Sequence, residues 1–416
     1  MTELEKRVLS YVDEKEVTEF LQDMIRCNSC YPPGDTRSVA EVCRAKLEAE
    51  GISVELAYPP ADLPGELDDH VDNARIPSVL AVLPGGPGKR MVWNAHIDTV
   101  PVEDVHNWRH DPFSGEIETD GGVDYVYGRG TGDDKGSVAS QVMAMIVLKR
   151  AGVKLKGTLL VNPVADEEGH GKRGTAWLLE SGRYGRPDIV IVGEQTNDEV
   201  AIAERAYTFS RIIVKGKACH GAMPWNGNNA IVKAARIVNL INTELEPKLE
   251  ARTHPYLPHS TVNISKIHGG VKENVVPELA EITFDRRVIP GETLMGAVAE
   301  IEELIKRLQA EDPFDYEFKF DYMSGVPTNT SPDDPLVVSM LSTIEDLTGR
   351  PAKPTGYKQG SDARYFAPLG IPIAIYGPSD PAVGHSPNER VSVEQLVEAV
   401  RVYALTAIRV LGTEED

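Results

Sequence analysis

The chain has 416 residues, more than one ordinary hydrophobic core accommodates, so we expect two domains. With 41% hydrophobic and 26% charged residues, its composition is that of a folded globular protein and not of a disordered one. The net charge of −21 argues against nucleic-acid and anionic-membrane partners, because both bind through clusters of Lys and Arg.

The N-terminal segment MTELEKRVLSYVDEKEVTEFL is charged throughout and lacks the apolar core of a signal peptide. No apolar run approaches the length of about 18 residues that a membrane helix needs. The chain contains four cysteines, at Cys27, Cys30, Cys43 and Cys219. Few cysteines without an export signal predict a cytoplasmic protein with reduced thiols.

The first half of the chain alternates between helical and strand patterns. Helical periodicity covers residues 16–26 and 36–50, and Gly51 supplies a stop signal. Short apolar runs predict strands at residues 78–83, 90–94, 158–164 and 188–192. Helices are predicted between some of them, at residues 137–151 and 174–181. This alternation predicts an α/β sheet with helices on its faces.

A second α/β pattern occupies residues 206–321. It consists of predicted strands at residues 209–215, 281–288 and 316–320 and predicted helices at residues 229–245 and 293–310. The first pattern then resumes with a helix at 335–348, a strand at 372–376 and a helix at 393–411. We therefore predict a larger α/β domain, formed by residues 1–205 and 322–416, with a smaller domain of residues 206–321 inserted into it.

Potential metal ligands follow several of the predicted strands. These residues are His96 and Asp98 after the second strand, Glu167 and Glu168 after the third, Glu194 after the fourth and His385 after residues 372–376. Each alone would be an ordinary capping or solvated polar group. Open α/β sheets, however, build their sites at strand ends, so the repeated placement there favours a metal site.

A glycine-rich stretch, Gly128-Arg-Gly-Thr-Gly-Asp-Asp-Lys-Gly136, precedes a predicted helix. Its first glycines suggest a dinucleotide fingerprint, but Asp133 occupies the third glycine position and Asp134 follows. Two carboxylates at a helix N-terminus would repel a pyrophosphate and would hold a cation. An NAD-dependent enzyme is therefore disfavoured, and neither a P-loop nor a GxSxG nucleophile elbow occurs.

Taken together, the motifs resemble those of the metallopeptidase family of aminoacylases, succinyl-diaminopimelate desuccinylases, acetylornithine deacetylases and glutamate carboxypeptidases. The motifs, in the family's order, are NAHIDTVP, YGRGTGDDKG, ADEEG, VGE, GKACHGAMPWNGNNAI, NVVPELAEITFDRR, GSDARYF and GHSPNERV. The resemblance covers nearly the whole chain. It implies a larger catalytic α/β domain with a mixed sheet, and an inserted α+β domain that serves as a lid and dimerisation module.

The resemblance also implies two divalent metal ions, with zinc preferred and manganese or cobalt as alternatives. His96 and Glu194 would bind one ion, Glu168 and His385 the other, and Asp133 both, with a cis peptide bond after Asp133. Asp98 would accept a hydrogen bond from His96 and fix its tautomer. Glu167 would be the general base that takes a proton from water and later gives it to the leaving amine.

Four residues are implied as contacts to the substrate. His220 would stabilise the tetrahedral oxyanion in the active site of a neighbouring subunit, which implies a homodimer formed through the inserted domain. Asn274 would be a further contact to the oxyanion or the substrate. Arg287 and Arg364 would bind a substrate carboxylate, because a guanidinium offers a bidentate match to it.

The predicted reaction is hydrolysis of the amide bond of a small N-acyl amino acid, as in a deacetylase or desuccinylase. A dipeptidase or carboxypeptidase is the nearest alternative. Ala206 stands where the resembling family has a glycine, and the bulky Tyr207 follows it. This difference allows an aromatic substrate. Hydrolytic deamination of an aryl amine carboxylate is therefore a further alternative. A non-catalytic descendant is disfavoured because every implied ligand and the base are present.

Overall fold

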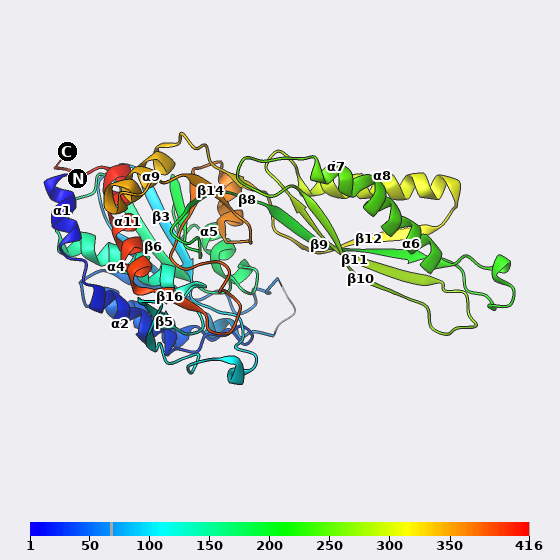
Figure 1. Ribbon diagram of the computed structural model, residues 1–416, viewed down its shortest axis with the longest axis horizontal. Coiled ribbons are helices and arrows are strands. Elements are labelled where there is room, and N and C mark those ends of the chain that lie inside the picture. The colour runs from blue at the N-terminus through cyan, green and yellow to red at the C-terminus, as the bar shows by residue number, and fades with distance from the viewer. Residues whose placement is uncertain (67–69, 416) are drawn as a thin grey trace. The chain divides into compact units, whose positions relative to one another are not determined.

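The computed structural model describes residues 1–66 and 70–415, and the chain divides into two compact units. The large unit comprises Met1–Ile202, Thr330–Tyr357 and Ser361–Asp416, and the small unit comprises Ala203–Asn329 and Lys358–Gly360. Most of the small unit comes from the middle of the chain, and Lys358–Gly360 joins it from a later segment. Figure 1 shows its strands and helices in the green to yellow colours of the middle of the chain.

The main sheet has nine strands, of which eight follow the order β1-β2-β6-β3-β7-β15-β8-β13, while β14 pairs with β8. Their bounds, in chain order, are Val54–Ala57 (β1), Ser78–Leu83 (β2), Arg90–His96 (β3), Thr158–Val164 (β6), Ile189–Val192 (β7), Val200–Glu204 (β8), Thr328–Asn329 (β13), Pro354–Tyr357 (β14) and Ile373–Ile375 (β15). The central strands β6, β3, β7 and β15 are parallel, and the outer pairs β1·β2, β2·β6 and β15·β8 are antiparallel. The predicted mixed sheet is thus confirmed.

Helices cover both faces of this sheet. Successive residues of a strand point to opposite sides, so the apolar strands present hydrophobic side chains on both faces. Trp93 of β3 packs on Tyr403 with their ring centroids 5.0 Å apart, whereas Val92 belongs to the cluster that contains Trp177 and Phe366. The helices of the large unit are Glu3–Leu9 (α1), Glu14–Ile25 (α2), Arg37–Glu48 (α3), Lys135–Arg150 (α4), Trp177–Glu180 (α5), Pro335–Thr348 (α9), Ala363–Phe366 (α10) and Val393–Leu411 (α11). Strands Ile117–Asp120 (β4), Val123–Tyr127 (β5) and Arg390–Ser392 (β16) form a separate three-stranded sheet.

The small unit is a four-stranded antiparallel sheet with helices on one face. Its strands follow the order β10-β11-β9-β12, with bounds Ala206–Lys215 (β9), Thr261–Gly269 (β10), Leu279–Val288 (β11) and Asp315–Met323 (β12). Its helices are Ala230–Leu240 (α6), which continues through a π-helical turn into Glu246–Glu250 (α7), and Leu294–Glu311 (α8). Residues of β9 and β11 such as Ile212 and Phe284 form its core with Ile237 and Ile301 of the two long helices. This is the α+β arrangement that the family resemblance implies.

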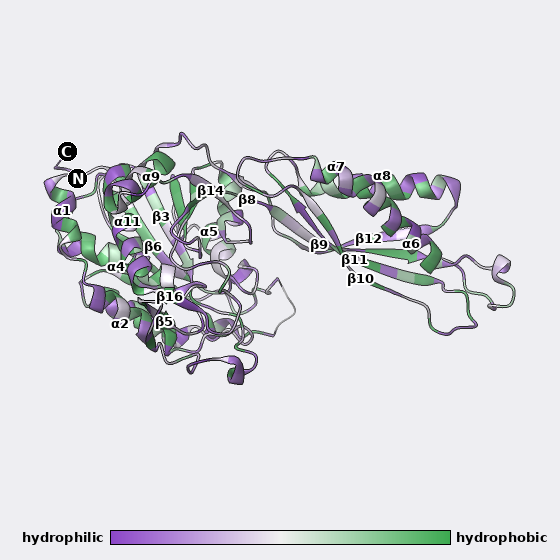
Figure 2. Cartoon of the chain, viewed as in Figure 1, coloured by the Kyte–Doolittle hydropathy of each residue, from purple (hydrophilic) through white to green (hydrophobic). Residues whose placement is uncertain are grey.

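Hydrophobic residues recur along α8 at helical spacing, and they are the residues that the structure buries. Figure 2 shows these residues interleaved with hydrophilic ones along α8. The sequence did not predict β10, whose C-terminal half is exposed and therefore lacks a clear alternation of apolar and polar residues. Among the helices of the described residues, none has the length and apolar character needed to cross a bilayer.

Candidate metal centre

The candidate ligands lie at one edge of the main sheet because three parallel strands end there. His96 is the last residue of β3 and is paired with Val164, the last residue of β6. Asn94 of β3 is paired with Val192, the last residue of β7, which leads directly to Glu194. The carboxyl ends of parallel strands are where open α/β sheets place their sites.

Three side chains converge at this edge: His96, Asp133 and Glu168 each offer a ligand atom, and these atoms lie within 4.8 Å of one another. Asp133 Oδ1 lies 2.9 Å from His96 Nε2, and Asp133 Oδ2 lies 3.0 Å from His385 Nε2. His385 Nε2 is also 3.3 Å from Glu168 Oε1. One carboxylate therefore faces both imidazoles, each through a different oxygen.

Glu194 is buried beside this group, and its carboxylate accepts a hydrogen bond of 2.8 Å from the Tyr357 hydroxyl. Burial raises the pKa of Glu194 well above its usual value, and the charges of Asp133 and Asp134 raise it further. Burial also disfavours the charge of Asp133, but hydrogen bonds from His385 and His96 outweigh it and hold the pKa of Asp133 low. The hydrogen bonds that His385 makes to the carboxylates of Asp133 and Glu168 raise the pKa of His385 to about 10.

Several carboxylates that repel one another lie here beside imidazole nitrogens. Together they form the mixed set of oxygen and nitrogen donors that binds divalent transition-metal ions. The residues present therefore fit such ions.

The loop that carries Asp133 is held by Glu389. Its Oε1 accepts hydrogen bonds from the backbone N–H groups of Gly130, Gly132 and Asp133, at 3.1, 2.9 and 2.9 Å. Its Oε2 accepts a hydrogen bond from the buried Arg129 guanidinium. The peptide bond between Asp133 and Asp134 is cis, as the resemblance implies.

Asp98 was predicted to accept a hydrogen bond from His96, and the structure shows that its backbone carbonyl, and not its carboxylate, is the acceptor. His96 Nδ1 bonds to the backbone carbonyl of Asp98 at 2.8 Å, whereas the Asp98 carboxylate is 3.9 Å away. That carboxylate instead accepts the backbone N–H groups of Glu167 and Glu168, at 3.2 and 3.0 Å. The carbonyl thus favours the His96 tautomer with the proton on Nδ1, and the carboxylate holds the turn that carries both glutamates.

Glu167 Oε1 forms an ion pair of 3.0 Å with Arg364 Nη1. No described residue donates a hydrogen bond to its other carboxylate oxygen. Arg364 is buried, so the guanidinium predicted to bind a substrate carboxylate already has a carboxylate partner.

His220, Asn274 and Arg287 all belong to the small unit. The loops of His220 and Asn274 are joined, since the N–H of Gly221 donates to the carbonyl of Asn274 at 2.8 Å. His220 Nδ1 accepts the N–H of Ala222, so the neutral ring carries its proton on Nε2.

Arg287 lies on β11 opposite Tyr207 of β9, with its guanidinium carbon 4.7 Å from the centroid of the tyrosine ring. Its Nε donates to Asp285 at 3.2 Å.

Sequence reasoning missed several residues that contact the cluster. Gln195 Nε2 donates to Asp133 Oδ2 at 2.9 Å, and its position directly after Glu194 was a usable signal. Glu389 lies inside the GHSPNERV motif, although nothing local indicates that it reaches residues 130–133. Tyr357 carries no local signal, because it is 163 residues from its partner.

The fold and this cluster define a metal-dependent hydrolase built on a mixed α/β sheet. The model of peptidase family M20/M25/M40 matches residues 92–409, which is more than half of the chain. The protein belongs to this family of metal-dependent peptidases and amidohydrolases, which confirms the predicted family and enzyme class.

Three relatives illustrate the similarity. A succinyl-diaminopimelate desuccinylase of Cupriavidus necator is 29% identical over 393 residues, covering 92% of this chain and 96% of its own. The structure of an aminopeptidase of Bacillus cereus has a TM-score of 0.73 at 19% identity, covering 96% of this chain and 99% of its own. A dinuclear metal-binding peptidase of Bacillus subtilis has a TM-score of 0.69 at 18% identity, with the same coverage of both chains.

Proposed function

We propose that the protein removes the acyl group from a small N-acyl amino acid by hydrolysing its amide bond at a pair of divalent metal ions. The observation that carries this proposal is the placement of Asp133 between His96 and His385, with one carboxylate oxygen toward each imidazole. A single carboxylate in this position has the geometry needed to bridge two ions. The solved structure of the dinuclear peptidase of Bacillus subtilis supports the expected number of ions.

In this proposal His96 and Glu194 would hold one ion, Glu168 and His385 would hold the other, and Asp133 would contribute a ligand to both. Zinc suits these donors best, and manganese or cobalt remain alternatives. When bound, such ions polarise a carbonyl group and lower the pKa of water. Tyr357 and Gln195 orient the ligands Glu194 and Asp133 by donating hydrogen bonds to them.

Glu167 acts as the general base in this proposal. Its carboxylate takes a proton from the attacking water and transfers it to the nitrogen of the leaving amine. The oxygen that does not face Arg364 is available for this transfer. His220 donates from Nε2 to the oxyanion that develops on the substrate carbonyl, which agrees with the tautomer that Ala222 favours.

Arg287 is the proposed contact for the substrate carboxylate. Stacking on Tyr207 holds its guanidinium in place, so its terminal nitrogens present a planar, bidentate face. Asn274 would add an amide donor from the loop that is joined to the loop of His220. Small amides that carry a carboxylate are therefore the proposed substrate class.

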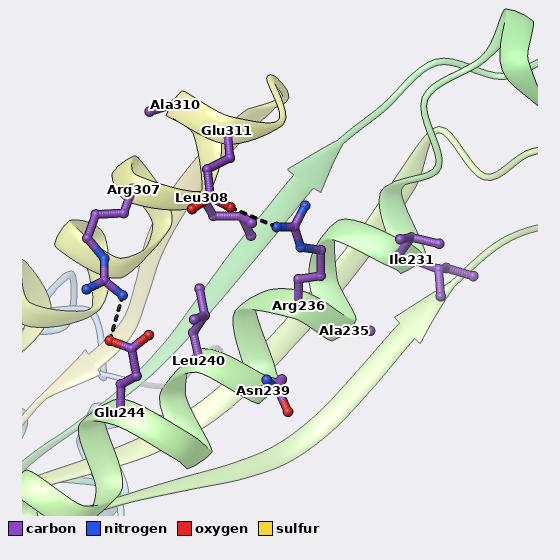
Figure 3. A pocket seen from close by; sticks show the side chains of 11 residues that line it. Ile231, Ala235, Arg236, Asn239, Leu240, Glu244, Arg307, Leu308, Ala310 and Glu311 are labelled. Carbon is purple, nitrogen blue, oxygen red and sulfur yellow. Dashed lines mark hydrogen bonds and ion pairs between the residues drawn. The ribbon is translucent and has the colours of Figure 1, made fainter.

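We further propose a homodimer formed through the small unit. Within the described residues, no strand pairs with the outer side of the edge strand β10, which exposes Ile267, and α6 exposes Ile231 and Val232. A groove of about 1030 Å³ lies between α6 and α8 (Figure 3). Two ion pairs cross it, Arg236–Glu311 and Arg307–Glu244. Apolar residues flanked by charges of both signs suit an isologous contact, in which the same patch serves both subunits.

The test is a release assay on protein stripped with a chelator and reloaded with zinc, manganese or cobalt. The substrates would be N-acetyl, N-succinyl and N-formyl amino acids, dipeptides and aminobenzoates, with free amino acid and free ammonia measured separately. Metal-dependent release of an amino acid from the acylated substrates, abolished in Glu167→Ala, is the expected result. Preference for dipeptides would assign a dipeptidase, ammonia alone would assign a deaminase, and equal rates with and without metal would overturn the proposal.

A further inference from the structure

A chain of buried polar side chains leads away from Glu167 into the interior of the large unit. Arg364 Nη1 contacts Glu167 Oε1 at 3.0 Å and also donates to the carbonyl of Ser361 at 2.9 Å. Arg364 Nη2 lies 3.4 Å from Asp362 Oδ1. The Thr175 hydroxyl donates to Asp362 Oδ2 at 2.5 Å. Asp362 thus uses one oxygen for Arg364 and the other for Thr175.

At its inner end, this network of polar side chains reaches the strand that carries His96. Thr175 Oγ1 accepts a hydrogen bond of 2.9 Å from Asn94 Nδ2, and Asn94 precedes His96 by two residues on β3. The same amide group of Asn94 contacts Asn162 on β6 and the Tyr184 hydroxyl, at 3.2 and 3.3 Å. All of these side chains except Glu167 are buried, and Asp362 has 1% of its surface exposed.

We propose that Asp362 is a positioning residue that orients the base Glu167 through Arg364. This inference rests on the proposed function, because it takes Glu167 to be the base. Arg364 is long, and a carboxylate partner on the side away from Glu167 restricts the rotamers of its guanidinium, which also donates to the Ser361 carbonyl. Asp362 supplies that partner and is itself fixed by Thr175. The base and the His96 strand are therefore held by one buried network.

Two properties of the network support a role in positioning over a purely structural one. First, a carboxylate buried next to a guanidinium costs free energy of desolvation, which an apolar side chain of similar size would avoid. Second, the network terminates on the Glu167 carboxylate, whose side chain is 13% exposed. Its second oxygen has no hydrogen-bond donor among residues 1–66 and 70–415, so this end of the network is open to a reactant. A base that shifts by about 1 Å loses on the order of 100-fold in rate.

The role is distinct from the predicted binding of a substrate carboxylate by Arg364, which stays a prediction. A residue that grips the substrate affects KM, and only for substrates that bear the carboxylate. A residue that positions the base affects kcat, and does so equally for an acylated amino acid and for its carboxamide.

The test is Asp362→Asn in the metal-loaded enzyme, with the best substrate of the release assay and its carboxamide. We expect kcat to fall by about 10- to 100-fold for both substrates, with KM and metal affinity within about twofold of wild type. Metal affinity would be measured by competition with a chromophoric chelator, which does not depend on turnover. Asp198→Asn makes the same substitution at another buried aspartate and serves as the matched control, with unchanged kcat expected.

The decisive comparison is made in the Glu167→Gln background. If Asp362 acts through Glu167, adding Asp362→Asn there lowers the residual rate by less than about twofold. A full additional loss, a rise in KM confined to the carboxylate substrate, or lost metal affinity would overturn the inference. If Asp362→Asn does not fold, Thr175→Val, which removes the donor to Asp362 together with the acceptor of the Asn94 amide, must lower kcat in the same way. Wild-type activity in Glu167→Gln alone would instead refute the proposed base.

Discussion

Asp133 uses both of its carboxylate oxygens, and each has a different set of partners. Oδ1 faces His96, whereas Oδ2 faces His385 and accepts from Gln195. The backbone that carries Asp133 is fixed, because three N–H groups of its loop donate hydrogen bonds to Glu389. The Asp133 carboxylate is therefore held in place between the two imidazoles. This rigidity supports the bridging position that we propose for Asp133.

Tyr357 tests whether the hydrogen bond to Glu194 matters for the proposed metal centre. Tyr357→Phe keeps the ring and removes the donor 2.8 Å from Glu194, so we expect metal affinity to fall by about 10-fold. A chelator competition titration would measure this. Tyr403→Phe is the matched control, because it removes a buried hydroxyl that bonds to the Tyr376 carbonyl and to Gln141. If both variants lowered the affinity equally, the effect would be one of general packing.

Substitution of Arg287 tests the proposed class of substrate. In Arg287→Lys the charge remains but the planar fork stacked on Tyr207 is lost, so we expect KM to rise by about 10-fold with kcat little changed. Steady-state kinetics with an acylated amino acid and its carboxamide would check it. The rise should be confined to the carboxylate, and an equal rise for both substrates would contradict the assignment.

At the scale of elements, Glu16 of α2 joins three helices. It accepts hydrogen bonds from Arg150 at the end of α4, at 2.6 and 2.8 Å, and from Lys46 of α3, at 2.7 Å. The bonds from Arg150, together with the bond from Lys46, lower the pKa of Glu16 to about 2 against the opposing effect of burial. The N-terminal helices are thereby attached to the helix that begins beside Asp133.

This pKa predicts a dependence of stability on pH. Because the folded-state pKa lies below the usual 4.5, the stabilisation by Glu16 is complete above about pH 4.5 and is lost as the pH falls toward 2. After allowance for solvent screening, we expect Glu16→Gln to lower the free energy of unfolding by about 1 to 2 kcal/mol at pH 7.

Urea unfolding would show the difference between Glu16→Gln and wild type shrinking between pH 5 and about pH 3. The exposed Glu19, which pairs with Lys15 at 3.7 Å, provides a control in Glu19→Gln with almost no effect. A difference that stays constant across this range would show that the charge of Glu16 is not responsible.

Two of the strands that sequence patterns missed share a physical cause. Strand β10 is at a sheet edge and largely exposed, and β4 has only exposed and half-buried residues. Neither shows the apolar alternation by which a half-buried strand is recognised. The predicted helix at residues 174–181 is a π-helical turn followed by the short α5, with non-helical dihedral angles at Gly174. The strands of the central sheet, buried on both faces, were recognised from their continuous apolar runs.

At the scale of the whole molecule, the proposed dimer depends on the exposed apolar residues of the small unit. Val232 on α6 and Ile267 on β10 are 50% and 49% exposed. Charging both, as Val232→Glu with Ile267→Lys, should convert a dimer to a monomer without changing the melting temperature of the large unit. Size-exclusion chromatography with light scattering would measure the mass. Val338→Lys, at a position of the large unit that is 51% exposed, is the control and should leave the mass unchanged.

Sharing of active sites between subunits predicts complementation. His220→Ala and Glu167→Ala are each expected to be nearly inactive, but mixed subunits would form one site with both residues intact. Recovered activity after subunit exchange, verified by mass, would support a role for His220 across the dimer. A mixture that exchanges subunits and stays inactive would count against it.

The sequence alone determined the family, the α/β class and the candidate ligands, because strand-end motifs and hydrophobic periodicity are local properties of the chain. It did not reveal that His96 bonds to the Asp98 carbonyl while the Asp98 carboxylate holds Glu167 and Glu168. Nor did it reveal that Glu389 fixes the Asp133 loop, or that Asp362 reaches Glu167 through Arg364. Most of these contacts join residues far apart in the chain, and even between near neighbours such as His96 and Asp98 the packing decides whether the carbonyl or the carboxylate is the acceptor. Only tertiary structure decides which buried carboxylate meets which donor, since each must find a partner once water is excluded.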